Sequence, residues 1–296
     1  MARWLKRGAA AVAILLVLLI VGVYGVSGAK LGRDYSAVAG HPLDLPTDSA
    51  ELAEGRRLLD VYHCTGCHGT DLGGRVMIDD AVFGFIASSN LTPGEGGVAA
   101  TYTPADWERA IRHGVSPEGR GLTIMPSADY GGISNADLGR MVAWLRQAPP
   151  IDHVRGEMRL GPAARAFLAA GIFALSPDFD SHHPGERIDA PPRGPTAEYG
   201  RYLAQGCRGC HGQELVGGIE IEPGTPPSAN LTPHADGLAD WSYGDFARAM
   251  RTGERPDGQI LSEMMPWPLF RAFEDDELRA LWAHLQTLAP QPDATN

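Results

Sequence analysis

Cysteine is scarce in this sequence: there are four in 296 residues, and they form two pairs. A disulfide framework built from scattered cysteines is therefore excluded. Convincing runs of alternating apolar and polar residues are missing, so the sequence indicates no half-buried strands. The net charge of −11 argues against a nucleic acid as the main partner. With 37 glycines and 23 prolines, the chain is expected to form small, mainly α-helical domains with long loops.

The N-terminal segment, residues 1–29, is expected to be a membrane anchor. Basic residues come first, and no charged residue follows over Ala9–Val26. Eighteen helical residues rise about 27 Å, close to the ~30 Å hydrocarbon core of a bilayer. A cleavable signal peptide has the same order of parts with a shorter apolar stretch, so the length favours an anchor and leaves cleavage open. The basic flank predicts a bacterial inner-membrane location, with the rest of the chain facing the periplasm.

The chain contains an internal repeat with an offset of about 140 residues. The matching segments keep their order, which chance explains poorly. We therefore expect two copies of one domain, at residues 48–150 and 195–291, joined by a partly ordered linker at residues 151–194. The matches are Asn90-Leu91-Thr92-Pro93 with Asn230-Leu231-Thr232-Pro233, Arg112 with Arg251, Met125-Pro126 with Met265-Pro266, and Leu145 with Leu285.

Each copy is expected to hold the same helices. An amphipathic segment at Glu51–Tyr62 runs into the first cysteine pair. A second helix begins at the Thr103-Pro104 cap, and a third follows Ser134 and ends near Gln147. Further helices are predicted at Ala197–Gln205, Tyr243–Arg251 and Asp275–Leu288 in the second copy and at Pro162–Leu175 in the linker.

The two cysteine pairs carry the chemistry. They lie in the runs Cys64-Thr65-Gly66-Cys67-His68 and Cys207-Arg208-Gly209-Cys210-His211. Cysteines at i and i+3 lie on one side of a helical turn, so two thiols can bond to the two vinyl groups of one porphyrin. The adjacent histidine is then carried under the iron as its fifth ligand. The pattern is a signature of c-type haem attachment and predicts two covalent haems.

Two other uses of paired cysteines fit the sequence less well. A zinc site can be built from two such pairs, but here each pair stands alone in its own copy of the repeat. A thioredoxin-like redox pair needs a βαβ context, and the sequence shows none.

The sixth ligand of each iron is predicted to be a methionine. No cysteine remains outside the two pairs, so thiolate ligation is excluded. The repeated Met-Pro places Met125 opposite His68, and Met265 opposite His211. A thioether opposite histidine raises the potential of haem in electron carriers. Met264 is adjacent to Met265, and only the following proline favours Met265. The histidines without a counterpart are expected to be structural or surface residues: His63, His113 and His284.

Both halves resemble class I c-type cytochrome domains. The order Cys-x-x-Cys-His-Gly, Asn-Leu-Thr-Pro, a helix with a tryptophan, Met-Pro and a terminal helix is similar to cytochrome c subunits of membrane-bound alcohol, aldehyde and gluconate dehydrogenases. Those subunits usually carry three such domains, whereas this chain has two and an N-terminal anchor. The resemblance covers about two-thirds of the chain. It implies a mainly α fold, with two tandem class I cytochrome c domains after a transmembrane helix.

One part of the family pattern is absent. Single-domain cytochromes usually place Gly-Pro after the haem motif, and its carbonyl holds the axial histidine. Here Gly73-Gly74-Arg75 and Gly217-Gly218-Ile219 contain no proline, so the sequence names no such partner. Three recurring pairs are candidate haem-pocket or propionate contacts, with helix packing or loop capping as the alternative: Asn90 and Asn230, Trp107 and Trp241, and Arg112 and Arg251.

These features predict an electron carrier, not an enzyme. With both axial positions filled, each iron would exchange single electrons and make or break no substrate bond. The donor would be a periplasmic dehydrogenase or a quinol-oxidising complex, and the acceptor a soluble cytochrome or an oxidase. The rival interpretation is a dihaem c-type peroxidase, which also has two Cys-x-x-Cys-His sites. It requires one open distal position, and two equivalent Met-Pro pairs argue against that.

Overall fold

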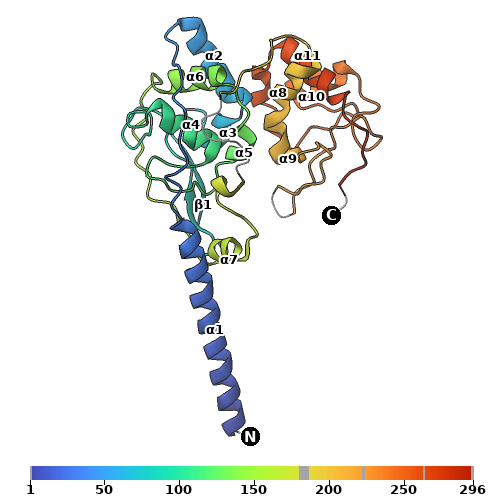
Figure 1. The fold of residues 1–296 in the computed structure, drawn as a ribbon. Helices are drawn as coiled ribbons and strands as arrows, with labels where there is room; N and C mark the ends of the chain where they lie inside the picture. The colour runs from blue at the N-terminus through green and yellow to red at the C-terminus, as the bar shows by residue number, and fades with distance from the viewer. Residues whose placement is uncertain (1, 180–186, 222–223, 263, 295–296) are drawn as a thin grey trace.

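A long helix leads into two lobes that lie side by side (Figure 1). The structure, a computed structural model, describes residues 2–179, 187–221, 224–262 and 264–294. The N-terminal helix α1 spans Ala2–Leu31 and is long and apolar enough to cross a membrane. A short helix of the linker, α7 (Pro162–Ala170), lies beside its C-terminal end.

The two lobes contain corresponding helices. The first lobe has α2 (Ser49–Val61), α3 (Cys64–His68), α4 (Pro104–His113), α5 (Ser127–Tyr130) and α6 (Asn135–Leu145). The second lobe has α8 (Ala197–Leu203), η2 (Ala204–Cys207), α9 (Arg208–His211), α10 (Tyr243–Thr252), η3 (Leu269–Ala272) and α11 (Asp275–Leu285). The mainly helical prediction is confirmed.

Local sequence signals explain where these helices begin. Thr103 and Ser242 each form a capping box with the aspartate three residues later, which satisfies backbone N–H groups at the first turns of α4 and α10. Ser134 caps α6, as predicted, because its side chain accepts a hydrogen bond from the backbone N–H of Asp137. The helix expected to reach Leu175 ends at Ala170 instead, because Gly171 adopts a left-handed conformation there.

The prediction that the chain contains no strands is wrong. The first lobe and the linker form a three-stranded antiparallel sheet in the order β1-β2-β3, with β1 at Val76–Asp80, β2 at Gly84–Ala87 and β3 at Arg159–Leu160. Most side chains of β1 are exposed. Strands this short with little burial produce no alternating pattern, which is why the sequence did not reveal them. A 3-10 helix, η1 (Ser176–Phe179), follows directly after the segment predicted as the linker helix.

In each lobe the first and last helices cross at a glycine. A Cβ added at Gly55 of α2 would lie 2.1 Å from the carbonyl oxygen of Arg140 in α6. A Cβ added at Gly200 of α8 would lie 1.8 Å from that of Ala280 in α11. Arg140 and Ala280 are 140 residues apart, so the contact falls at equivalent positions of α6 and α11. The absence of a side chain at each glycine allows the two backbones to approach closely.

We expect Gly200→Ala to destabilise the protein by about 1–3 kcal/mol, because the new methyl group overlaps a backbone carbonyl that cannot move alone. Thermal unfolding followed by circular dichroism should show a fall in Tm of several degrees. Gly206→Ala is the matched control, since no atom lies within 4 Å of its added Cβ. Equal melting temperatures for the two variants would contradict the crossing geometry.

Two candidate haem c sites

The first cysteine pair opens onto a cavity in the first lobe. Helix α3 is one short turn that carries Cys64, Cys67 and His68, and all three line this cavity together with Met125. The cavity contains about 790 Å³ of empty space, its open mouth included. The structure therefore brings the four residues predicted to hold one haem to a single place. Most of the remaining wall is aliphatic or aromatic, including Leu59, Leu91, Val98, Tyr102, Ile111, Leu122, Tyr130 and Ile133.

A backbone carbonyl orients each histidine of the attachment motifs. The Nδ1 of His68 donates to the carbonyl of Ser89 at 2.8 Å, and the Nδ1 of His211 donates to that of Ala229 at 2.7 Å. This bond fixes the tautomer and leaves Nε2 as the lone-pair donor. Burial also lowers the pKa of both imidazoles, which favours the neutral, ligating form. The partner that the sequence did not name is thus the residue preceding each Asn-Leu-Thr-Pro.

The two recurring asparagines hold these carbonyls in place. Asn90 Oδ1 accepts hydrogen bonds from the backbone N–H and the hydroxyl of Thr92, at 2.9 and 2.8 Å, and its amide donates to the carbonyl of Ile151. Asn230 makes the same bonds with Thr232 and Gln291. Neither the side chain of Asn90 nor its loop partner Thr92 lines the cavity. The structure therefore places them as loop anchors, the alternative role foreseen for them.

The recurring arginines connect helices. Arg112 is buried in the first lobe and donates to Glu108 at 2.9 Å and to the side chain of Asn135 at 3.0 Å. Arg251 donates to the side chain of Asp275 at 2.9 Å. Asn135 and Asp275 are the first residues of α6 and α11. Both arginines thus tie the middle helix of a lobe to its last helix, and Arg112 lies outside the cavity wall.

Trp107 has the environment expected of a residue that contacts a bound haem. Its side chain is buried in the cavity wall, and its Nε1 has no hydrogen-bond partner among the residues that the structure describes. A buried indole N–H without an acceptor is costly, and a haem propionate would supply one. Two thiols, an imidazole, a thioether and this donor in one apolar cavity fit haem c. The predicted pairing of Trp107 with Trp241 is wrong. Trp241 directly precedes the N-cap Ser242 of α10, as Tyr102 precedes Thr103, and Phe246 occupies the position in α10 that Trp107 has in α4. Trp241 packs, partly buried, against the hydrophobic core.

The two Met-Pro loops have the same backbone turn. The N–H of Ser127 donates to the carbonyl of Met125 at 2.8 Å, and the N–H of Trp267 donates to that of Met265 at 2.7 Å. Met125 and Met265 both pack, partly buried, against the hydrophobic core. Met264 is exposed. Of the two adjacent methionines, the structure therefore places Met265 in the position equivalent to Met125.

Each Met-Pro loop also packs against the attachment motif of the other lobe. A Cβ added at Gly209, between the second pair of cysteines, would lie 2.2 Å from Oδ2 of Asp129. A Cβ added at Gly66, between the first pair, would lie 3.5 Å from Cδ1 of Leu269. Asp129 and Leu269 follow Met125 and Met265 by four residues each. The lobes therefore meet with approximate two-fold symmetry, motif against loop in both directions.

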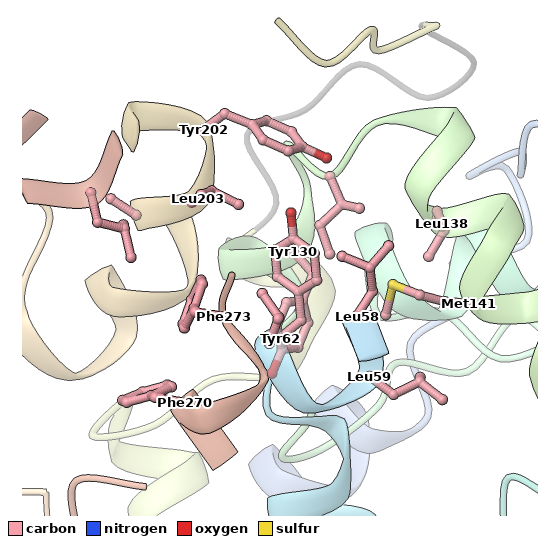
Figure 2. Close-up of a cluster of buried hydrophobic side chains, with 14 of the residues drawn as sticks. Leu58, Leu59, Tyr62, Tyr130, Leu138, Met141, Tyr202, Leu203, Phe270 and Phe273 are labelled. Atoms are coloured by element: carbon pink, nitrogen blue, oxygen red, sulfur yellow. The ribbon is translucent and has the colours of Figure 1, made fainter. Parts of the chain in front are cut away.

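Polar contacts also join the two lobes in both directions, around a hydrophobic cluster that both lobes share. Arg57 of α2 donates to both carboxylate oxygens of Glu277 in α11, at 2.6 and 2.7 Å. Tyr202 of α8 donates to Asp137 of α6 at 2.6 Å. Asp137 and Glu277 occupy equivalent positions in the last helices of the two lobes. Figure 2 shows the cluster, with tyrosines in its centre, the aromatic residues of the second lobe on one side and the aliphatic residues of the first lobe on the other.

Comparison with known proteins shows what the chain is similar to. Residues 50–145 match a family model described as cytochrome c oxidase, cbb3-type, subunit III. The chain is 25% identical over 274 residues to the cytochrome c subunit of a quinone-dependent alcohol dehydrogenase from Gluconacetobacter polyoxogenes, covering 83% of this chain and 57% of the relative. It is 36% identical over 105 residues to the gluconate 2-dehydrogenase cytochrome c subunit of Pantoea cypripedii, covering 32% of this chain and 24% of the relative.

A shorter relative matches nearly end to end. A diheme cytochrome c-type protein from Cereibacter sphaeroides is 27% identical over 300 residues, covering 91% of this chain and 95% of the relative. The chain spans only 25% to 57% of the alcohol dehydrogenase subunits that it matches. These relatives are named as cytochromes, most of them as cytochrome subunits of dehydrogenases. The chain thus contains a c-type cytochrome domain at residues 50–145 and is similar to cytochrome c subunits of dehydrogenases and to a diheme cytochrome c.

Proposed function

We propose that this chain is a membrane-anchored dihaem cytochrome c that transfers single electrons in the periplasm. The observation that carries the proposal is the equivalent geometry of the two halves. Each half has a Cys-x-x-Cys-His turn, a carbonyl that orients its histidine, and a Met-Pro loop with the same turn. Residues 48–150 and 195–291 are accordingly two tandem cytochrome c domains. The relative named as a diheme cytochrome supports the count of two.

Different residues would bind the porphyrin and the iron of each haem. Cys64 and Cys67 form the thioether bonds of the first haem, and Cys207 and Cys210 form those of the second. His68 with Met125 would hold the first iron, and His211 with Met265 would hold the second; bound haem would supply reversible one-electron chemistry. With both protein ligands in place, the two sites would exchange electrons and would not bind a substrate.

The reciprocal packing of the lobes brings the two attachment motifs close together. Asp129 of the first lobe lies against Gly209, which stands between Cys207 and Cys210, and Leu269 of the second lobe lies against Gly66, between Cys64 and Cys67. An electron can pass between the haems at this contact without leaving the protein.

The partners follow from the anchor and the relatives. Helix α1 would hold the haem domains at the outer face of a bacterial inner membrane. Curated relatives are named as cytochrome subunits of alcohol, gluconate and fructose dehydrogenases. The donor is accordingly a dehydrogenase or a quinol-oxidising complex, and the acceptor is a downstream cytochrome or oxidase.

Replacing the axial methionines tests the ligand assignment. Met125→Ala should retain both covalent haems, since no cysteine changes, and should lower the potential of one haem, because the thioether favours ferrous iron. Its weak near-infrared band from methionine on ferric iron should fall by about half, on the premise of one such bond per haem. Met265→Ala should have the same effect on the other haem. Redox titration and absorption spectroscopy measure both changes.

Met264→Ala is the matched control and should leave band and potentials unchanged. An unchanged spectrum and potential in Met125→Ala would refute its assignment and make a histidine such as His113 the candidate. Rapid turnover of hydrogen peroxide at a high-spin haem of the unaltered protein would contradict the electron-carrier proposal and favour the dihaem peroxidase.

Replacing Asp129 tests the contact between the lobes. Asp129→Asn removes a negative charge that lies against Gly209 and follows Met125 by four residues. Loss of this charge destabilises ferric iron, so at least one haem potential should rise by on the order of tens of millivolts. The titration is best performed at pH 8, because burial raises the pKa of the Asp129 carboxyl. Asp189→Asn, at an exposed carboxylate paired with exposed Arg187, is the control. Identical potentials in both variants would mean that the lobes do not pack in this way.

A further inference from the structure

An almost uncharged segment lies beside the end of α1. Residues 160–177 contain one charged residue, Arg165. In α7 the side chains of Ala164 and Leu168 are buried, whereas Phe167 is exposed and Ile172, just beyond the helix, is 68% exposed. Figure 1 shows α7 at the end of the first lobe from which α1 emerges, remote from the second lobe.

Specific contacts fix α7 against the last turns of α1. The guanidinium of Arg165 lies 5.0 Å from the ring centre of Tyr24 and donates to the hydroxyl of Ser27 at 3.2 Å. The Nζ of Lys30 donates to the carbonyl of Leu168 at 2.7 Å. Ser27 is buried by this packing. The position of α7 along α1 is therefore determined by side-chain contacts from three turns.

The aromatic residues of α1 indicate where a bilayer would begin and end. Trp4 and Tyr24 are separated by 20 residues, a rise of about 30 Å, which equals the thickness of a hydrocarbon core. Tryptophan and tyrosine concentrate at the two membrane–water interfaces. Tyr24 therefore marks the outer boundary, and α7, whose Arg165 covers the ring of Tyr24, lies at the level of the lipid headgroups.

The turn between β1 and β2 extends the same surface. The carbonyl of Val82 accepts the N–H of Ala163 at the start of α7. The ring of Phe83 lies 6.1 Å from that of Phe167, centre to centre. Val82 is exposed. The neighbouring carboxylate of Asp80 accepts the backbone N–H groups of Val82 and Phe83, so its charge is engaged within the turn.

From this arrangement we propose that α7 and the β1–β2 turn form a lipid-binding surface that inserts Phe167, Ile172 and Val82 into the headgroup region of the bilayer crossed by α1. The occupant is lipid because the surface is continuous with the membrane-spanning helix and lies at the depth set by Tyr24. Apolar side chains on a short segment whose neighbouring charges are those of Lys30 and Arg165 suit an interfacial position. This inference rests on the part of the proposed function that anchors α1 in the membrane. It holds the first lobe at a fixed tilt, with the second lobe farther from the lipid.

Spin labels in nanodiscs test the proposal. The four native cysteines are bound to haem in the mature protein, so Ile172→Cys introduces one free thiol for a nitroxide label. The label's collision rates with lipid-soluble oxygen and with a water-soluble nickel complex report its surroundings. Two matched sites provide references: Ile260→Cys, 62% exposed in the second lobe, and Ile14→Cys, 60% exposed in the middle of α1. One protein per phospholipid disc excludes contact with a second copy.

We expect the ratio of oxygen to nickel collisions at residue 172 to be shifted above the ratio at residue 260 towards that at residue 14. Equal ratios at residues 172 and 260 would place α7 in water and overturn the proposal. A water-like ratio at residue 14 would overturn it as well, because α1 would then not cross the bilayer. Haem content and visible spectra of the same samples report on the electron-carrier function separately, so the two failures are distinguishable.

Discussion

The imidazole of each attachment motif donates one ring N–H to a backbone carbonyl, and the loops of both lobes are built to hold that carbonyl in place. The asparagine after it engages a threonine two residues on and reaches the chain beyond the last helix. A glycine with positive φ, Gly74 or Gly217, closes the loop after the motif by donating its N–H to the carbonyl of the motif histidine. The direction of each imidazole thus depends on residues spread over a whole lobe.

The contact between the lobes uses the same parts a second time. The loop that presents Met125 or Met265 continues into a short helical segment that covers the other lobe's motif. A side chain at Gly209 would displace the carboxylate of Asp129, whereas a Cβ at Gly66 would lie at an ordinary contact distance from Leu269. On the proposed ligation, one segment would both supply an iron ligand in its own lobe and form the contact with the other lobe. The distance between two bound haems would then depend on the folding of each lobe.

Regular local patterns were predictable from the sequence. The caps at Thr103 and Ser134 predict the start of two helices, because each side-chain oxygen accepts the backbone N–H three residues later, an interaction within a few residues of sequence. The repeat placed the methionine loops because duplication preserves spacing. By contrast, the carbonyls of Ser89 and Ala229 have no side-chain signature. Their only signal was the recurring Asn-Leu-Thr-Pro next to them, which the sequence presented as a turn or a pocket contact.

The features that could not be predicted from the sequence depend on interactions between distant segments. Arg112 and Arg251 carry charges that suit propionates, yet both are engaged by the start of the last helix in their own lobe. The three strands are short, they pair residues up to 76 positions apart, and most side chains of β1 are exposed, so no local pattern marks them. The contact between α1 and α7 depends on Arg165 finding Tyr24 across 141 residues. Tertiary packing, which a single sequence does not display, decided each of these.

The mass of the mature chain under denaturing conditions tests the central claim most directly. Extraction with acidified acetone removes haem that is not covalently bound, so the remaining increment counts haems held by thioether bonds. The account predicts an increment of two haems, and of one haem after Cys207 and Cys210 are both replaced by alanine. A single haem on the unaltered chain, or two on the double variant, would contradict it.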